Sequence, residues 1–138
     1  DLGVPHYLIQ STLSGVVAQR LIRTLCPHCK KPASQDSDTW NILTRGWDMP
    51  KPDSVNSPVG CLECRQTGFH GRTGIYEMLP VNMRIRSLIS AELDLPRLKR
   101  AALEQGMRPL RISAANQVAR GITTVDEILA VLPPTSED

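Results

Sequence analysis

The chain consists of short stretches with regularly spaced apolar residues, separated by polar stretches rich in Gly and Pro. Residues 5–14 predict a short helix, because a proline opens them and three apolar side chains fall on one helical face. Residues 16–25 contain no breaker, and their periodicity fits either a strand or a helix. We favour a strand, because Gly15 separates this segment from the first helix and the β-branched residues Val16 and Val17 open it.

The second half of the chain predicts one strand followed by four short helices. Residues 74–79 form a strand-like run that stops at Pro80. Thr124 and Glu127 have the spacing of a capping box at the start of the last helix. We expect residues 80–132 to form a small helical bundle. The residues that open its helices, as caps or in the first turn, are Asn82, Asp94, Pro109 and Thr124.

The stretch between these halves, residues 31–60, is polar and contains four prolines. Ser37 or Asp38 is expected to cap a short helix within it. The apolar residues of that helix predict a satellite cluster over the cysteine pairs that flank the stretch. They are Trp40, Leu43 and Trp47. Residues 48–60 predict a loop, because Pro, Asp, Ser and Asn dominate them.

Composition narrows the possible classes only slightly. A length of 138 residues corresponds to one domain or to part of one, and a net charge of +2 is too small to indicate nucleic-acid binding. No apolar run approaches the ~18 residues that a membrane span needs, so we expect no direct membrane insertion. The sequence begins at Asp1 rather than at a methionine, and we expect it to be part of a longer protein.

All four cysteines of the chain occur as two Cys-x-x-Cys pairs. The pairs are Cys26 with Cys29 and Cys61 with Cys64. Two such pairs predict a closed structural zinc site, because this spacing lets both thiolates of a pair bind one tetrahedral ion. Two disulfides or redox-active thiols are the alternative. His28 and His70 could replace a cysteine, although four sulfurs already complete the coordination.

A glycine-rich run, residues 68–74, follows the second pair and contains Arg72. We interpret this run as a tight turn that presents an arginine, whose guanidinium suits a phosphate group. Local pairing of Arg72 with a carboxylate or carbonyl groups is equally consistent with the pattern. Arg20 and Arg23 project from the preceding predicted strand, where solvation of a surface is the simpler interpretation. There is no P-loop and no complete catalytic constellation in the sequence.

Two segments closely resemble the ATPases of type II secretion and type IV pilus assembly. Residues 17–29 (VAQRLIRTLCPHC) are similar to the signature that leads into the zinc arm of that family. Residues 61–77 (CLECRQTGFHGRTGIYE) are similar to its second knuckle and the Gly-Arg-x-Gly motif. Residues 3–5 and 121–124 also fit, so the resemblance spans nearly the whole chain.

The resemblance implies an α+β fold in three segments. Residues 1–25 would be the end of a RecA-like ATPase domain, 26–79 a tetracysteine zinc-binding arm, and 80–138 a helical C-terminal subdomain. The intact protein would be a cytoplasmic homohexamer that hydrolyses ATP with Mg²⁺. It would work at the bacterial inner membrane through platform proteins of the secretion or pilus machine.

The resemblance also assigns roles to single residues. The arginine that matches Arg72 would reach the nucleotide phosphates, and Arg20 and Arg23 are further candidates for this contact. The four cysteines would hold Zn²⁺. The chain lacks the family's P-loop, so it would not be catalytic alone. The competing hypothesis is a zinc-ribbon module that binds nucleic acid, although its basic residues are dispersed among acidic ones.

Overall fold

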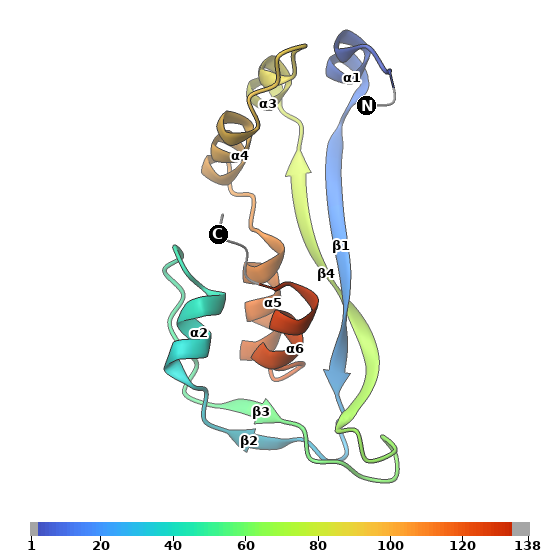
Figure 1. The fold of residues 1–138 in the computed structure, drawn as a ribbon, viewed down its shortest axis with the longest axis vertical. Coiled ribbons are helices and arrows are strands. Elements are labelled where there is room, and N and C mark those ends of the chain that lie inside the picture. Colours follow the sequence, from blue (N-terminus) through green and yellow to red (C-terminus); the bar gives the residue numbers. More distant parts are fainter. Residues whose placement is uncertain (1–2, 134–138) are drawn as a thin grey trace. The chain divides into compact units, whose positions relative to one another are not determined.

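The computed structural model describes residues 3–133, which form the mixture of helices and strands expected of an α+β fold. Two long strands pair with each other and run in opposite directions (Figure 1); they are β1 (Gly15–Leu25) and β4 (Phe69–Pro80). The strand interpretation of residues 16–25 is therefore confirmed. The strand predicted for residues 74–79 also exists, but it begins five residues earlier.

The chain divides into two compact units, each of which combines two separate stretches. Unit 1 contains the chain up to Ala18 together with Glu77–Arg108. Unit 2 contains Gln19–Tyr76 together with the chain from Pro109 onward. The predicted division into residues 1–25, 26–79 and 80–138 consists of consecutive segments, whereas each compact unit combines two separate stretches. That division stays a prediction about the parent protein.

Unit 1 is built from three helices and the adjoining ends of the long strands. Asn82 and Asp94 cap two of these helices as predicted, since their side chains accept hydrogen bonds from Ile85 N and Arg97 N at 2.9 and 3.0 Å. A small core of Val81, Ile85, Ala101 and Ala102 holds the unit together. The helices are α1 (His6–Thr12), α3 (Met83–Leu88) and α4 (Leu95–Glu104).

Unit 2 contains the larger core, in which residues from strands and helices far apart in sequence meet. Thr124 caps the last helix by accepting a hydrogen bond from Glu127 N at 3.2 Å. The shorter elements of this unit are β2 (Lys31–Ala33), α2 (Ser37–Leu43), β3 (Val55–Ser57), α5 (Leu110–Ala119) and α6 (Val125–Val131). The buried core residues are Ile22, Trp40, Leu43, Val55, Ile75, Ala114, Ala115, Val118, Val125 and Ile128.

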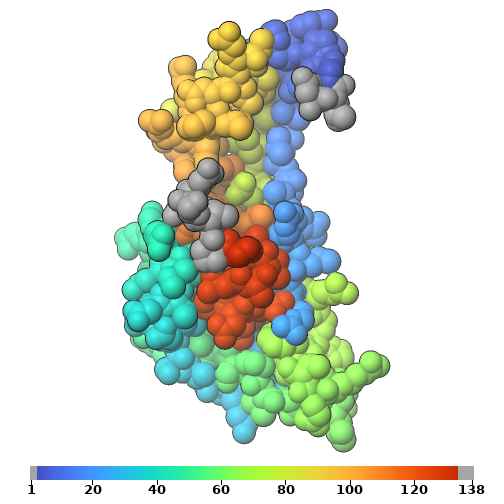
Figure 2. All heavy atoms as spheres, viewed as in Figure 1, coloured from blue at the N-terminus to red at the C-terminus, as the bar shows by residue number. Residues whose placement is uncertain are grey.

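Helix α2 differs from its prediction in two respects. Its cap is Asp36, whose carboxylate accepts a hydrogen bond from Thr39 N at 2.9 Å, rather than Ser37 or Asp38. Its apolar side chains do not form a satellite cluster, because Trp40 and Leu43 are buried in the main core of unit 2. Figure 2 shows α2 (teal) lying against α6 (red), as this packing requires. Trp47 lies beyond the end of the helix and is only partly buried.

The predicted loop 48–60 contains an unpredicted strand. Strand β3 pairs antiparallel with β2, with Lys31 opposite Ser57 and Ala33 opposite Val55. Pro32 is tolerated in β2 because the sheet has only two strands, so each strand has a free edge. Among residues 3–133, no helix combines the length and apolar character needed to cross a bilayer.

Candidate metal centre

The two cysteine pairs, 35 residues apart in sequence, meet in unit 2. Their four sulfur atoms all lie within 4.8 Å of one another, and none of the cysteines is in a disulfide. The sulfur–sulfur distance is 3.8 Å for Cys26–Cys61, 3.8 Å for Cys29–Cys64 and 3.7 Å for Cys61–Cys64. A regular tetrahedron with Zn–S bonds of ~2.3 Å has edges of about 3.8 Å. Three of the six sulfur–sulfur distances therefore match the edges of a tetrathiolate zinc site, and the remaining three are within 4.8 Å.

Each cysteine pair lies on a tight turn that continues directly from or into a long strand. In the first turn, Lys30 N donates to Cys26 O at 3.0 Å, just after β1 ends. In the second, Gln66 N donates to Cys61 O at 2.8 Å. This turn is closed by left-handed backbone at Arg65 and Gln66, with φ of 54° and 65°. The two turns bring the sulfur atoms of each pair to one side.

Backbone N–H groups point at the sulfur atoms, as they do around thiolates. Gly60 N donates to Cys29 Sγ at 3.3 Å, and Cys61 N and Gly68 N each donate to Cys64 Sγ at 3.2 Å. Burial acts to raise the pKa of Cys64, but these backbone donors and the neighbouring thiols hold that pKa at about 6, below its ordinary value of 9.0. Cys64 is therefore the cysteine prepared to hold a deprotonated sulfur, the form that binds metal. At Cys61 a backbone hydrogen bond acts to lower the pKa, but burial and the neighbouring thiols raise it to about 11.

Gly68 connects the two turns through its backbone. Its N–H donates to Cys64 Sγ, and its carbonyl accepts a hydrogen bond from Cys26 N at 2.9 Å. Its φ is +77°, and a Cβ at this position would collide with Pro58. Only glycine satisfies both the left-handed conformation and the close approach of the 58–59 segment.

The histidines that might have replaced a cysteine lie outside the cluster. His28 is exposed, and the ring of His70 lies 3.2 Å from the carbonyl of Glu63 through Nδ1. Within residues 3–133, the one group of side chains arranged to hold a metal consists of the four cysteines. Four sulfurs leave no open coordination position, so a zinc ion here would be structural rather than catalytic.

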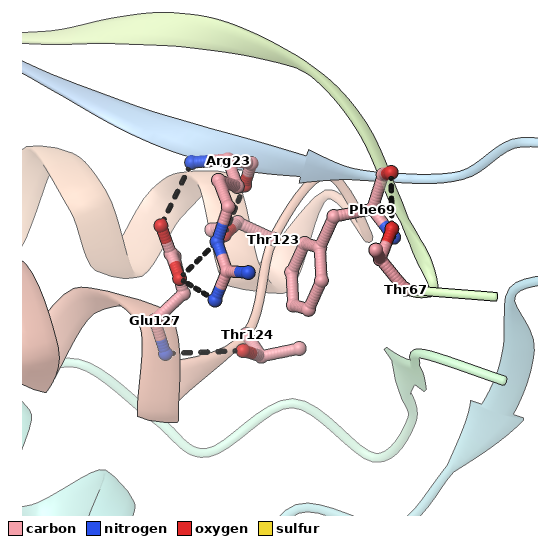
Figure 3. Close-up of polar contacts among 6 residues, drawn as sticks. All are labelled: Arg23, Thr67, Phe69, Thr123, Thr124 and Glu127. Carbon is pink, nitrogen blue, oxygen red and sulfur yellow. Dashed lines mark hydrogen bonds and ion pairs between the residues drawn. The ribbon is translucent and has the colours of Figure 1, made fainter. Parts of the chain in front are cut away.

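Arg23, a candidate phosphate contact, is instead paired with Glu127 (Figure 3). The carboxylate accepts from Arg23 Nε at 2.9 Å and Nη2 at 2.7 Å, and also from the Arg23 backbone N at 3.0 Å. The guanidinium also lies over the ring of Phe69, 4.3 Å from its centroid. Glu127 is only 6% exposed, and burial acts to raise its pKa, but the bonds from Arg23 outweigh burial and lower it. A phosphate would have to displace this carboxylate to bind Arg23.

The segment that carries Glu127 also forms hydrogen bonds with backbone groups of β1. Leu25 N donates to Ile122 O at 2.8 Å, and Thr123 Oγ1 donates to Arg23 O at 2.9 Å. Together with the Glu127 bond to Arg23 N, these contacts satisfy three backbone groups of the strand just before Cys26. The start of α6 therefore supports the strand from which the first cysteine turn projects.

The other two candidate arginines are exposed. Arg72 lies within strand β4 and not on a tight turn. Of the three glycines in the run, Gly68 and Gly71 have positive φ and Gly74 does not. The guanidinium of Arg72 makes no hydrogen bond or ion pair with any described residue. Arg20 Nη1 donates to Gln19 O at 3.0 Å. Strand alternation places Arg20 on the face of buried Ile22 and Arg72 on the opposite face. The three arginines therefore do not converge on one point.

Only half of the capping box predicted for Thr124 and Glu127 forms. The capping-box pattern did single out Glu127, and its N–H does bond to Thr124. Its carboxylate, however, goes to Arg23, 104 residues away in sequence. A glutamate three residues after the N-cap can bond back to its own cap or reach a distant arginine. The local pattern could not separate these two arrangements.

The chain belongs to the family described as type II/IV secretion system protein, whose model matches residues 1–130. This confirms the resemblance seen in the two cysteine-containing segments.

Particular relatives are similar over nearly the whole chain. The type IV pilus assembly ATPase TfpB of Acinetobacter baylyi is 45% identical over 135 residues, covering 98% of this chain and 23% of the relative. The type II secretion system protein E of Pseudomonas aeruginosa is 40% identical over 131 residues, covering 95% and 26%. The type II secretion system ATPase E of Vibrio cholerae is 35% identical, covering 95% and 25%. The chain thus spans about a quarter of the length of these curated relatives.

Proposed function

We propose that this chain is the zinc-bearing C-terminal part of a longer ATPase that powers type II secretion or type IV pilus assembly. Two of the relatives above carry the name ATPase. The observation that carries the proposal is the cluster of four cysteine sulfurs, all within 4.8 Å of one another, inside a chain that matches this family over residues 1–130. In this proposal residues 1–25 end a RecA-like domain, 26–79 form the zinc arm, and 80–138 form the helical subdomain.

The proposed Zn²⁺ is held by Cys26, Cys29, Cys61 and Cys64, and its role is to stabilise the arm. It ties the turn after β1 to the turn before β4, so that both long strands are joined at one end. Structural zinc in zinc-finger peptides contributes on the order of 10–16 kcal/mol of apparent binding energy. The arm therefore depends on the metal for its fold.

ATP and Mg²⁺ would bind to the rest of the parent protein, because this sequence has no P-loop. Arg72 is the residue that we propose reaches the nucleotide phosphates, from this subunit or a neighbour in the hexamer. Its guanidinium is exposed and forms no pair with residues 3–133, so it is available to an oxygen ligand. Arg20 is the second candidate, whereas Arg23 would first have to leave Glu127.

The proposal places the intact hexamer in the cytoplasm, attached to inner-membrane platform proteins of the machine. ATP turnover by the full-length parent is the test. We expect Arg72→Ala to lower turnover by about 10²-fold or more, because one donor to developing charge is removed. Arg45→Ala is the matched control, since Arg45 is also an exposed arginine of unit 2. Zinc content and hexamer mass should stay unchanged in both variants.

Two outcomes would contradict the proposal at different levels. If Arg72→Ala turned over ATP at the wild-type rate, the zinc arm would have no catalytic arginine, although the ATPase assignment would stand. If the parent itself hydrolysed no ATP, the proposed activity would be wrong.

A further inference from the structure

Unit 1 contains a surface pocket of about 380 Å³ between α3 and α4. The metal centre belongs to unit 2, so this pocket is a separate feature. Its charged lining consists of three arginines and two acids, with Leu88 and Ala101 among the remaining residues. The charged residues are Arg84, Arg97, Arg100, Asp94 and Glu104.

The charges of the pocket are only partly compensated. Glu104 forms an ion pair with Arg84. The Asp94 carboxylate accepts a hydrogen bond from the backbone N of Arg97, as the cap of α4. The guanidinium groups of Arg97 and Arg100 form no hydrogen bond or ion pair with any residue in the described part of the chain. Three positive and two negative side chains leave a net charge of +1.

The spacing of the two unpaired arginines suits an anionic group. Residues three apart on a helix are neighbours on its surface, so the like charges of Arg97 and Arg100 repel each other. Guanidinium groups bind carboxylates and phosphates in a bidentate manner. An occupant with negative charge would therefore relieve the repulsion and fill the pocket.

Two exposed apolar residues that adjoin lining residues in sequence, although they do not line the pocket themselves, indicate which kind of anion binds. Met83 directly precedes Arg84 and is 87% exposed, and Leu95 directly follows Asp94 and is 63% exposed. Arg and Met are both enriched in protein interfaces. A free phosphate would leave these apolar side chains in water, whereas a peptide would cover them.

We propose that the pocket between α3 and α4 binds an acidic peptide segment of a partner protein, one that carries apolar side chains beside its carboxylates. The carboxylates bind Arg97 and Arg100, and the apolar side chains cover Met83 and Leu95. Clusters of arginine recognise acidic motifs in this way. This inference does not depend on the ATPase activity proposed above.

Fluorescence anisotropy on the zinc-loaded chain tests the proposal, with a short fluorescein-labelled peptide of alternating glutamate and leucine as the probe. We expect binding at low salt and at least tenfold weaker binding by Arg97→Glu or Arg100→Glu. Lys99→Glu is the matched control, because it makes the same charge change on the same helix at an exposed residue that does not line the pocket. It should change binding less than twofold. Circular dichroism establishes that all variants are folded.

Three results would overturn the proposal. One is the absence of any binding by the glutamate–leucine peptide. Another is an equal loss in Lys99→Glu, which would mean general attraction between charges. The third is complete displacement of the peptide by an equal concentration of inorganic phosphate, which would assign the pocket to a small anion. As a positive check, the double variant Arg97→Glu/Arg100→Glu should bind a lysine–leucine peptide that the wild-type chain does not bind.

Discussion

Replacing Glu127 by glutamine should destabilise unit 2 measurably, although it changes a single atom. The carboxylate is 6% exposed and accepts three hydrogen bonds from Arg23. Glutamine can keep the bond from the Arg23 backbone N through its amide oxygen. Its NH₂ group would then face the guanidinium, so both side-chain bonds at 2.9 and 2.7 Å are lost.

The magnitude follows from the unequal exposure of the two partners. A hydrogen bond to a charged group contributes ~1.5–3 kcal/mol, which would total up to ~6 kcal/mol for two such bonds. The guanidinium is 55% exposed, so water replaces much of what it loses, and exposed ion pairs contribute only ~0–1 kcal/mol. We therefore expect Glu127→Gln to cost about 2 kcal/mol, or a fall in melting temperature on the order of 8 °C.

Urea denaturation of the zinc-loaded chain, followed by tryptophan fluorescence, measures this cost, because Trp40 lies in the core of the same unit. A double-mutant cycle with Arg23→Met isolates the pair, and its coupling energy should exceed ~1 kcal/mol. Asp126→Asn is the matched control, since it removes a charge from the same helical turn at an exposed position. It should cost less than ~1 kcal/mol. A coupling energy near zero, or equal effects of the two substitutions, would refute this account.

Three further predictions concern the same unit. The stabilisation by Glu127 should be lost in acid, because the folded state lowers the pKa of this carboxyl below its ordinary value of 4.5. The wild type should therefore exceed Glu127→Gln in stability by the full amount above pH 4.5. This difference should narrow as the pH falls through the folded-state pKa of Glu127. Gly68→Ala should weaken zinc binding in chelator competition by tenfold or more, whereas Gly46→Ala, with a similar φ of +76° but no atom within 4 Å of its Cβ, should leave zinc affinity unchanged. Cys64→Ser should unfold the arm, and unchanged metal content together with an unchanged thermal melt would contradict this.

Sequence reasoning succeeded where the determining interactions are local. Asn82, Asp94 and Thr124 were identified as helix caps, and each accepts a hydrogen bond from the residue three positions later. A cap depends on a few neighbouring residues, so its pattern is visible in one dimension. The way each Cys-x-x-Cys pair directs both of its sulfurs to one side was also predictable, because each pair lies within a single local turn.

Sequence reasoning failed where two distant segments determine each other. Strands β2 and β3 have three residues each, too few to show an alternating pattern, and Lys31 pairs with Ser57 across 26 positions. Trp40 was assigned to a satellite cluster because its helix is surrounded by polar sequence. It packs instead into a core supplied by β1, β4, α5 and α6. Burial of this kind depends on long-range contacts that periodicity cannot identify.

The candidate site was predicted only in part for the same reason. The spacing of the cysteines predicted their cluster, but nothing near Arg23 indicated a partner in α6. The glycines around Arg72 predicted a turn, yet pairing with β1 keeps residues 69–80 in a strand. Whether Arg72 contacts a nucleotide depends on the rest of the parent protein and stays a prediction.

The central claim is that the four cysteines hold one zinc ion. Measuring the metal content of the purified chain, together with X-ray absorption at the zinc edge, tests this claim most directly. The account predicts one zinc per chain, surrounded by four sulfurs at about 2.3 Å. A first shell that contained nitrogen would mean that a histidine replaces a cysteine. Substoichiometric zinc with the cysteines oxidised in pairs would contradict the claim outright.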